Sequence, residues 1–338
     1  MNVLLCLSHA IEEYDQLRLL SGLGYNVASI GGYIDPANPH DPKRPPLPEI
    51  PCVPEVKAAV DALGTSDNLG AAQANIPDAI LDWLGDDGVI IYHHYLDRLY
   101  GQWPRILDWR RGARRVIWRT VGQSVENNER QSAPYRAEGL EIVRYSPKER
   151  NIPGYAGEDA LIRFYKDPAD YGGWTGEGEY VLGFGQHYVQ RDPWTNYRFF
   201  REATQGLPTR IVGPGSEVVG GPGELTFDEL RAELQRASVY LYTGTQPASY
   251  TLGLIEAMMT GTPVISMPAS QFGIFPYGPE LFEGPEFVSW GDLEAVQALL
   301  RHRLADTDPS DYSARTRERA IELFGRDKAE AAWKAYLG

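Results

Sequence analysis

Short apolar runs alternate with longer stretches of helical periodicity along the first half of the chain. The runs typical of buried strands are residues 2–7, 88–94, 114–120, 140–146 and, more weakly, 160–165. A helix, a glycine turn and a second strand are expected within residues 12–30, and a further helix at 96–111. Strands that alternate with helices in this way predict a parallel α/β sheet.

A second series of the same kind begins at residue 180. Its apolar runs are residues 180–185, 209–213, 238–243 and 263–267, and its helical stretches are 194–204, 226–236, 250–260, 291–305, 309–324 and 326–337. The Gly- and acid-rich segment 166–179 separates the two series, and we expect it to be the interdomain linker. Two such series in 338 residues predict two Rossmann-like domains facing a central cleft, because open parallel sheets bind ligands beyond their strand ends.

The chain has a net negative charge, but the segment from Arg98 to Lys166 has a net positive charge. The chain has 32 Lys and Arg against 46 Asp and Glu, a net charge of −14, which argues against a nucleic-acid binder. From Arg98 to Lys166, however, 14 basic residues outnumber 8 acidic ones, and Trp109 and Trp118 lie among the arginines. Such a segment suits a phosphate backbone with stacked bases, although scattered solvated arginines are the alternative.

The remaining bulk features favour a cytoplasmic protein. Cys6 and Cys52 are the two cysteines, and their spacing suits neither a disulfide framework nor a zinc site. The first fifteen residues lack a basic region and turn acidic, so we expect no secretory signal. No apolar run reaches 18 residues, so we expect no transmembrane segment.

Three segments of the second series converge at the predicted carboxyl ends of its strands. Gly185 and Gln186 follow the first strand with Arg191 a few residues beyond, and Gly213 lies in the glycine-rich turn after the second. The third segment is a helix start with Ser249 as the expected N-cap, comprising Ser249, Tyr250, Thr251 and Leu252. Helix N-termini present unpaired N–H groups to phosphate oxygens, and Arg191 would add a full positive charge.

Glu256 is the one carboxylate on that otherwise apolar helix. Burying an ionised carboxylate costs several kcal/mol, as an order of magnitude, unless other groups hydrogen-bond to it. It lies about one turn beyond the helix start, so it could accept hydrogen bonds from the vicinal hydroxyls of a ribose. The alternative is a carboxylate that reaches a crevice edge and is merely solvated. Diphosphate at the helix start and ribose at Glu256 together predict a nucleotide-sugar site.

At these positions the chain resembles the retaining GT-B glycosyltransferases, in particular glycosyltransferase family four. The similar segments are "YVLGFGQHYVQRD", "TRIVGPG" and "LGLIEAMMTGTPVIS", and the resemblance covers residues 180–338 well but 1–165 only in architecture. It implies an acceptor domain at 1–168, a nucleotide-sugar domain at 178–325, and a C-terminal helix at 326–338 that packs back on the first domain. It departs at Ala248, where the family has a sugar-binding glutamate, and at Gln186, where it has one of two diphosphate cations.

The resemblance also implies a chemistry. A hexosyltransferase-like enzyme would transfer sugar from a nucleoside-diphosphate sugar, above all a UDP-sugar, with retention of configuration and without a metal or other cofactor. The catalytic roles fall on Arg191, which with the helix start would stabilise the leaving diphosphate, and on Glu256, which would bind the ribose. The two departures leave open a non-catalytic sugar-nucleotide-binding protein or a GT-B-fold sugar-nucleotide epimerase.

The acceptor would bind the first domain. Two strands there end in side chains that could contact it: His93 and His94 on one, Arg119 and Gln123 on the other, with ordinary loop-edge histidines as the alternative. The Arg-rich segment 98–166 makes DNA carrying a modified base of the 5-hydroxymethylpyrimidine type one candidate acceptor. Polysaccharide, lipid and protein acceptors are the alternatives.

Overall fold

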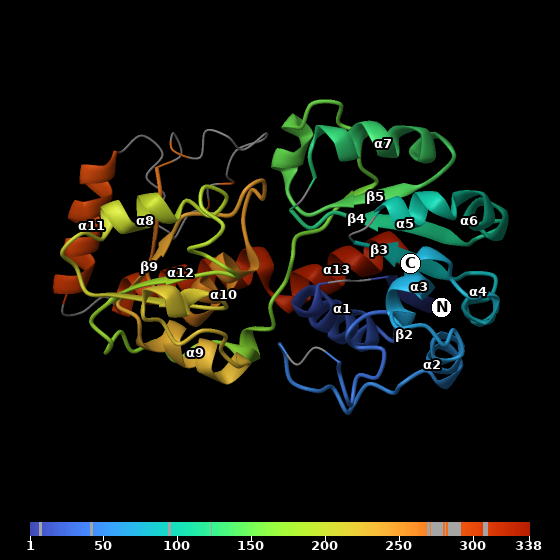
Figure 1. The fold of residues 1–338 in the computed structure, drawn as a ribbon, viewed down its shortest axis with the longest axis horizontal. Helices are drawn as coiled ribbons and strands as arrows, with labels where there is room; N and C mark the ends of the chain where they lie inside the picture. The colour runs from blue at the N-terminus through green and yellow to red at the C-terminus, as the bar shows by residue number, and fades with distance from the viewer. Residues whose placement is uncertain are drawn as a thin grey trace. The chain divides into compact units, whose positions relative to one another are not determined.

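The computed structural model describes most of the chain in two compact units. The described residues are 1–6, 9–40, 43–93, 96–122, 124–268, 271, 280, 282, 292–306 and 310–338. Unit 1 comprises Met1–Pro147, Pro153–Ile162 and Ala329–Gly338, and unit 2 comprises Lys148–Ile152 and Arg163–Lys328. Each unit has its own parallel sheet (Figure 1). Each also has its own hydrophobic core.

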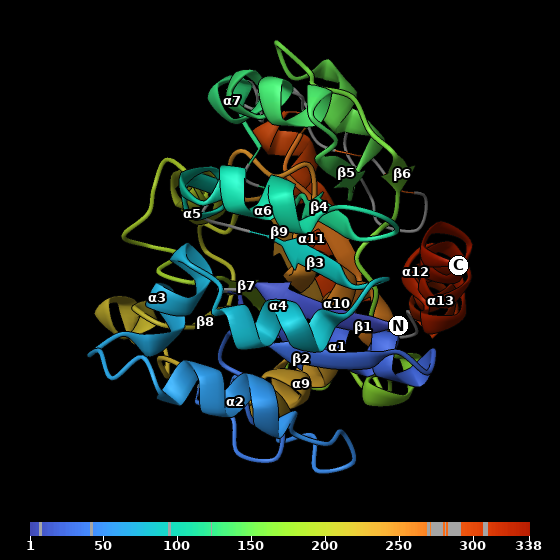
Figure 2. The same cartoon turned by 90° about the vertical axis from the view of Figure 1, so that its right-hand side faces the viewer.

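Unit 1 contains a six-stranded sheet in the order β2-β1-β3-β4-β5-β6, which Figure 2 shows from β2 upward. Its strands are β1 (Asn2–Cys6), β2 (Asn26–Ser29), β3 (Val89–Tyr92), β4 (Arg115–Arg119), β5 (Glu141–Arg144) and β6 (Ala160–Leu161). Its helices are α1 (Ala10–Gly22), α2 (Pro54–Asp61), α3 (Asn68–Ala74), α4 (Asp78–Leu84), α5 (Leu96–Gly101), α6 (Trp103–Trp109) and α7 (Glu126–Ala137). All its strand pairs are parallel, with Val3 opposite both Val27 and Val89.

The helix expected at 96–111 is broken into α5 and α6. Gln102 separates them, and its side chain accepts from the Ile76 backbone N–H at 3.0 Å and donates to the Gln73 carbonyl at 2.7 Å. Pro104 lies in the first turn of α6, where a residue without a backbone N–H is tolerated but a continuous helix would be interrupted. The hydrophobic periodicity predicted one continuous helix because it does not take this proline into account.

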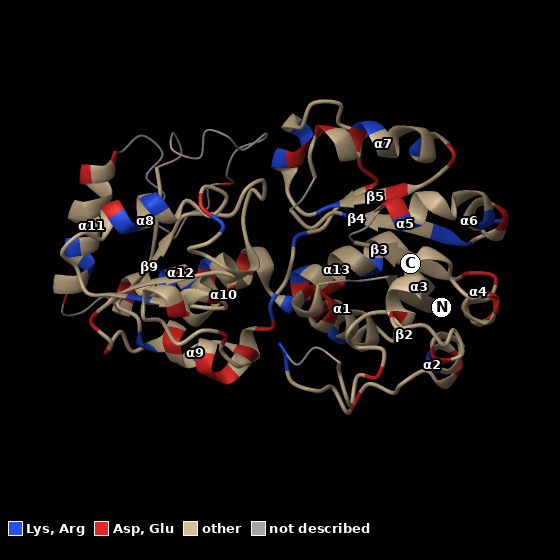
Figure 3. Cartoon of the chain, viewed as in Figure 1, with Lys and Arg blue, Asp and Glu red and all other residues tan. Residues whose placement is uncertain are grey.

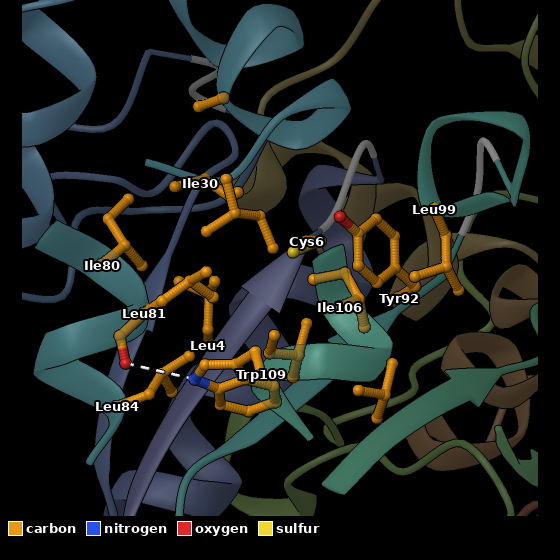
Figure 4. Packing of buried hydrophobic residues seen from close by; sticks show 14 of the residues in the cluster. Leu4, Cys6, Ile30, Ile80, Leu81, Leu84, Tyr92, Leu99, Ile106 and Trp109 are labelled. Carbon is orange, nitrogen blue, oxygen red and sulfur yellow. Dashed lines mark hydrogen bonds between the residues drawn. The ribbon is translucent and has the colours of Figure 1, made fainter. Parts of the chain in front are cut away.

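The main core of unit 1 lies between one face of this sheet and helices α2 to α6. Leu4 of β1 is fully buried, and Figure 4 shows it packed beside Trp109, whose indole N–H donates to the Leu81 carbonyl at 3.3 Å. Burying both faces of a parallel sheet favours continuous apolar strands rather than alternating ones. The runs at 2–7, 88–94, 114–120 and 140–146 accordingly contain strands, whereas the run at 160–165 is a strand only over Ala160–Leu161.

The last helix, α13 (Arg326–Leu337), joins unit 1 from Ala329 onward. Arg115 of β4 donates to the Tyr336 carbonyl at 2.9 Å, and its guanidinium lies 4.3 Å from the Tyr336 ring centroid. Trp333 is fully buried and lies 5.9 Å from the Arg119 guanidinium. This end of the chain is therefore an integral part of unit 1.

Unit 2 contains a four-stranded parallel sheet in the order β10-β9-β7-β8. Its strands are β7 (Val181–Phe184), β8 (Thr209–Val212), β9 (Val239–Tyr242) and β10 (Val264–Ser266). Its helices are α8 (Tyr197–Ala203), α9 (Phe227–Arg236), α10 (Leu252–Thr260), α11 (Leu293–Ala305) and α12 (Ser310–Phe324). Helices α8 and α11 pack together over one face, and α9, α10 and α12 lie on the other (Figure 1). No helix within the described ranges has both the length and the apolar content to cross a membrane.

Residues 166–179, which we expected to be the interdomain linker, belong to unit 2. The Trp174 indole N–H donates to the Ala237 carbonyl at 2.7 Å, and the Gln235 side chain donates to the Gly172 carbonyl at 2.7 Å. These contacts fix the segment against the C-terminal end of α9. The division between the units falls earlier, between Ile162 and Arg163.

Candidate functional site

Two glycine turns meet at the carboxyl edge of the unit 2 sheet. Gly185 follows β7 and Gly213 follows β8, and the Gly185 N–H donates to the Val212 carbonyl at 3.4 Å. Gly213 has a φ of +109°, and a Cβ there would lie 2.6 Å from the Gly185 carbonyl oxygen. Only glycine combines that backbone angle with so close an approach. The two predicted donor-binding glycines therefore lie side by side.

Helix α10 begins at the same edge, two residues later than we expected. Thr251 rather than Ser249 is the N-cap, with an extended backbone and a side chain that accepts from the Leu254 N–H at 3.3 Å. Tyr250 is buried, with its ring 5.5 Å from that of Phe324, so it packs into the core before the helix starts. Ser249 and Tyr250 thus belong to the loop that precedes α10, and Leu252 is the first helical residue.

The first turn of α10 lies directly against the end of β7. A Cβ on Gly253 would lie 2.6 Å from the ring of Phe184, the last residue of that strand. The N–H groups of Leu252 and Gly253 have no partner within the helix, since the first turn of any α-helix lacks intrahelical acceptors. The structure therefore brings a helix N-terminus beside the two glycine turns, an arrangement able to bind phosphate oxygens.

Arg191 lies on an exposed loop at this edge. Its backbone N–H donates to the His187 carbonyl at 2.9 Å and its side chain to the Gln186 carbonyl at 3.3 Å, and both Gln186 and Arg191 are exposed. The loop is held to the segment that enters α10, because the Tyr188 and Thr243 hydroxyls lie 2.7 Å apart. Burial raises the pKa of the Tyr188 hydroxyl, which stays protonated at neutral pH. Arg191 is thus an accessible cation on a loop that this hydrogen bond holds in place.

Glu256 lies in the second turn of α10 and is buried, with 2% of the residue exposed. Its Oε1 lies 3.0 Å from the Lys166 ammonium and 3.3 Å from the Tyr171 hydroxyl, which donates to it. The alternative of a merely solvated carboxylate is therefore wrong. Burial raises the pKa of the Tyr240 hydroxyl well above its ordinary value, and nearby groups that include the Glu256 carboxylate raise it further.

Sequence reasoning did not single out Lys166 or Tyr171 for this site. They lie 90 and 85 residues before Glu256, and no local spacing links a residue of the Gly-rich segment to a helix so far along the chain. The available signal was the presence of a single carboxylate on an apolar helix, which required a partner of unknown position.

The predicted acceptor contacts are placed less favourably. His93 is buried beyond β3, where its backbone N–H donates to the Cys6 carbonyl at 3.4 Å, and His94 and Gln123 lie outside the described residues. Arg119 is fully buried, and its guanidinium donates to the Ile162 carbonyl and faces Trp333. Arg119 is thus an interior residue of unit 1 and not a surface contact.

The basic segment from Arg98 to Lys166 does not form a surface of unopposed positive charge. At least nine of its fourteen cations pair with carboxylates: Arg105 with Asp78, Arg111 with Asp108, Arg114 with Asp86, Arg115 with Glu141, Arg130 with Glu126, Arg136 with Asp159, Arg144 with Glu129, Arg163 with Glu280 and Lys166 with Glu256. Three more donate to neutral oxygens, namely Arg98, Arg110 and Arg119. Figure 3 shows basic and acidic positions interspersed along α4 to α7. Most of the local excess charge is therefore balanced within its own unit.

A metal centre is not evident in the part of the chain that the structure describes. Within those residues, no three His, Cys, Asp or Glu side chains gather closely enough to hold an ion.

Comparison with known proteins identifies the architecture. No protein-family model and no curated protein matches the chain. Among solved structures, an alpha-glucosyltransferase bound to UDP and a 13-mer DNA matches with a TM-score of 0.64 and 10% identity, covering 100% of this chain and 99% of that one. The fold is GT-B.

Two further GT-B neighbours support that assignment. HepE from Anabaena, in complex with UDP-glucose, matches with a TM-score of 0.62 and 12% identity over 99% of both chains. TarM matches with a TM-score of 0.56 and 12% identity, and the match covers 77% of this chain but only 58% of TarM. At these identities the likeness is one of fold.

Proposed function

We propose that the protein is a glycosyltransferase that binds a UDP-sugar on unit 2 and transfers the sugar to an acceptor. The carrying observation is the convergence of the Gly185 and Gly213 turns, the α10 N-terminus and the exposed Arg191 at one sheet edge. The GT-B fold and the UDP-glucose bound to the neighbour HepE support the donor class. Ligand binding beyond the carboxyl ends of parallel strands is the general rule for such sheets.

The proposed chemistry rests on stabilising the leaving group. Departure of UDP develops negative charge on its β-phosphate, and the N–H groups of Leu252 and Gly253 together with Arg191 would balance that charge. Glu256 would accept hydrogen bonds from the ribose. Membership of family four, retention of anomeric configuration and independence of a metal belong to the same proposal and rest on the motif from Leu252 to Ser266.

A ligand screen tests the proposal. Thermal unfolding is measured with UDP, UDP-glucose, UDP-N-acetylglucosamine and the corresponding GDP, ADP and dTDP compounds. A ligand at 100 times its Kd stabilises the folded state by about 2.7 kcal/mol, so UDP and at least one UDP-sugar should raise the Tm by several degrees. If neither UDP nor any UDP-sugar raises the Tm, the proposal fails.

The product analysis separates the alternatives that Ala248 and Gln186 leave open. UDP released from a UDP-sugar supports a transferase, which hydrolyses its donor slowly when the acceptor is absent. A UDP-sugar recovered with a changed sugar identifies an epimerase. A donor recovered unchanged, both alone and with every acceptor class, identifies a binding protein.

A modified base in DNA is one candidate for the acceptor. It is supported by the GT-B neighbour whose structure contains UDP and DNA. The paired arginines of the basic segment weigh against it, because phosphate binding would have to compete with their carboxylate partners. Transfer of radiolabelled glucose to duplexes with and without 5-hydroxymethylcytosine decides between DNA and the polysaccharide, lipid or protein alternatives.

A further inference from the structure

The Lys166–Glu256 ion pair lies deep inside unit 2. The two side chains are 1% and 3% exposed, and the ammonium nitrogen lies 3.0 Å from Oε1. The Tyr171 hydroxyl donates to the same oxygen at 3.3 Å. A buried carboxylate without a cation takes up a proton more readily, because burial disfavours its charged form. Lys166 is therefore a cation that favours an ionised Glu256.

Lys166 is held in place through its backbone. Its N–H donates to the Phe324 carbonyl at 2.9 Å, at the end of α12, and it forms a parallel bridge with Gly325. The next residue, Asp167, pairs with Arg326 at 3.2 Å. The ammonium thus reaches α10 from a backbone segment that is held in place, and not from the protein surface.

Arg317 of α12 links this segment to the helix that carries Glu256. Its guanidinium donates to the Pro168 carbonyl at 2.9 Å and also to the Met259 carbonyl in α10. Arg317 therefore connects the segment just after Lys166 to α10, so both partners of the ion pair lie on parts of unit 2 that are held together.

We propose that Lys166 is a positioning residue for nucleotide recognition: it keeps the Glu256 carboxylate ionised and oriented to accept hydrogen bonds from the ribose hydroxyls. This inference rests on the proposed function. An ionised carboxylate only accepts hydrogen bonds, whereas a protonated one donates through one oxygen and accepts less well. A side chain without charge at position 166 would therefore weaken recognition of the ribose and leave recognition of the diphosphate in place.

The test compares the Kd for UDP with the Kd for 2′,3′-dideoxy-UDP by isothermal titration calorimetry. Hydrogen bonds to a charged group are expected to make the wild type prefer UDP by about 10- to 100-fold. Lys166→Met should reduce the preference to below about 3-fold while the Kd for dideoxy-UDP changes little. Lys166→Arg, which keeps the charge, should restore most of it, and Lys328→Met, at an exposed lysine of the same unit, should leave it unchanged.

Combining variants isolates the pair. In a Glu256→Gln background, Lys166→Met should not change the ratio further, because the group on which Lys166 acts is gone. If Lys166→Met does not fold, Lys166→Gln replaces it and the same ratio decides. A folded variant that lowers affinity for both ligands equally would show a purely structural role and overturn the inference.

The outcomes distinguish this inference from the proposed function. No UDP binding by the wild type refutes the proposed function itself. UDP binding with no preference for the ribose, or a preference that Glu256→Gln preserves, refutes the assignment of Glu256 and the inference with it. A preference lost in Glu256→Gln but kept in Lys166→Met refutes the role of Lys166 alone.

Discussion

A methyl group on Gly213 would lie 2.6 Å from the carbonyl oxygen of Gly185. Gly213 also has a backbone φ of +109°, which residues other than glycine rarely adopt. The two turns that would surround the diphosphate therefore depend on the absence of a single side chain. The contact joins the ends of β7 and β8, which are adjacent in the sheet.

Gly213→Ala should accordingly weaken both the fold of unit 2 and its ligand binding. A matched control is Gly206→Ala, since Gly206 has a φ of +77° but an added Cβ would have no neighbour within 4 Å. Both variants should lose about 1 to 2 kcal/mol from the backbone angle. Gly213→Ala should lose about 1 to 3 kcal/mol more from the clash and weaken UDP binding. Denaturant unfolding and calorimetry measure the two effects, and equal losses in the two variants would contradict the steric argument.

The strands could be predicted from the sequence because a parallel sheet buries both faces. The run at 88–94 contains β3, and the run at 180–185 contains β7, each within two residues of its ends. Such runs carry their own signal, since burial on both sides leaves no polar alternation. The fold followed from these runs and from the helices between them.

The details of the site depend on contacts that the local sequence does not encode. Ser249 and Thr251 are both suitable N-caps, and the burial of Tyr250 between them selects the second. Lys166 reaches Glu256 only through the tertiary fold. The arginine count gave the charge of the basic segment but not its acidic partners, several of which come from other elements, as Asp78 does for Arg105.

The buried pair Arg144–Glu129 should contribute strongly to the stability of unit 1. Both side chains are fully buried, and two N–H groups donate to the two carboxylate oxygens at 2.6 and 2.7 Å. Arg144→Met leaves a buried carboxylate without its cation, and such losses cost about 3 to 5 kcal/mol. Chemical unfolding followed by tryptophan fluorescence provides the measurement.

The control for that variant lies on α7, the helix that carries Glu129. Arg130 pairs with Glu126, but their side chains are 69% and 48% exposed. Solvent screens such a pair, so Arg130→Met should change the free energy of unfolding by less than about 1 kcal/mol. Comparable losses for Arg144→Met and Arg130→Met would show that burial does not set the strength of these pairs.

The two cysteines should differ in reactivity. Burial raises the pKa of the Cys6 thiol, which is 2% exposed, while the half-buried Cys52 has a pKa raised first by burial and then by Asp35. Because the thiolate is the reactive form, N-ethylmaleimide at pH 8 should modify Cys52 slowly and Cys6 only after unfolding. Raising the pH towards 9.5 should accelerate labelling of Cys52, since the thiolate fraction increases (roughly tenfold per pH unit below the pKa). Mass spectrometry of native and unfolded samples checks both sites, and rapid native labelling of Cys6 would contradict its burial.

Arg191 should act on the phosphates of the donor and not on its nucleoside. Its guanidinium is exposed at the edge where the α10 N-terminus and the glycine turns meet, and a hydrogen bond between charged groups contributes about 1.5 to 3 kcal/mol. Arg191→Ala should therefore raise the Kd for UDP by about 10- to 100-fold while the affinity for uridine stays within about twofold. Arg201→Ala, at an exposed arginine in the last turn of α8, serves as the matched control and should change neither value. Calorimetry at two salt concentrations gives the decisive comparison: the loss in Arg191→Ala should shrink as salt screens the phosphate charge. An equal loss for UDP and uridine would place Arg191 away from the diphosphate.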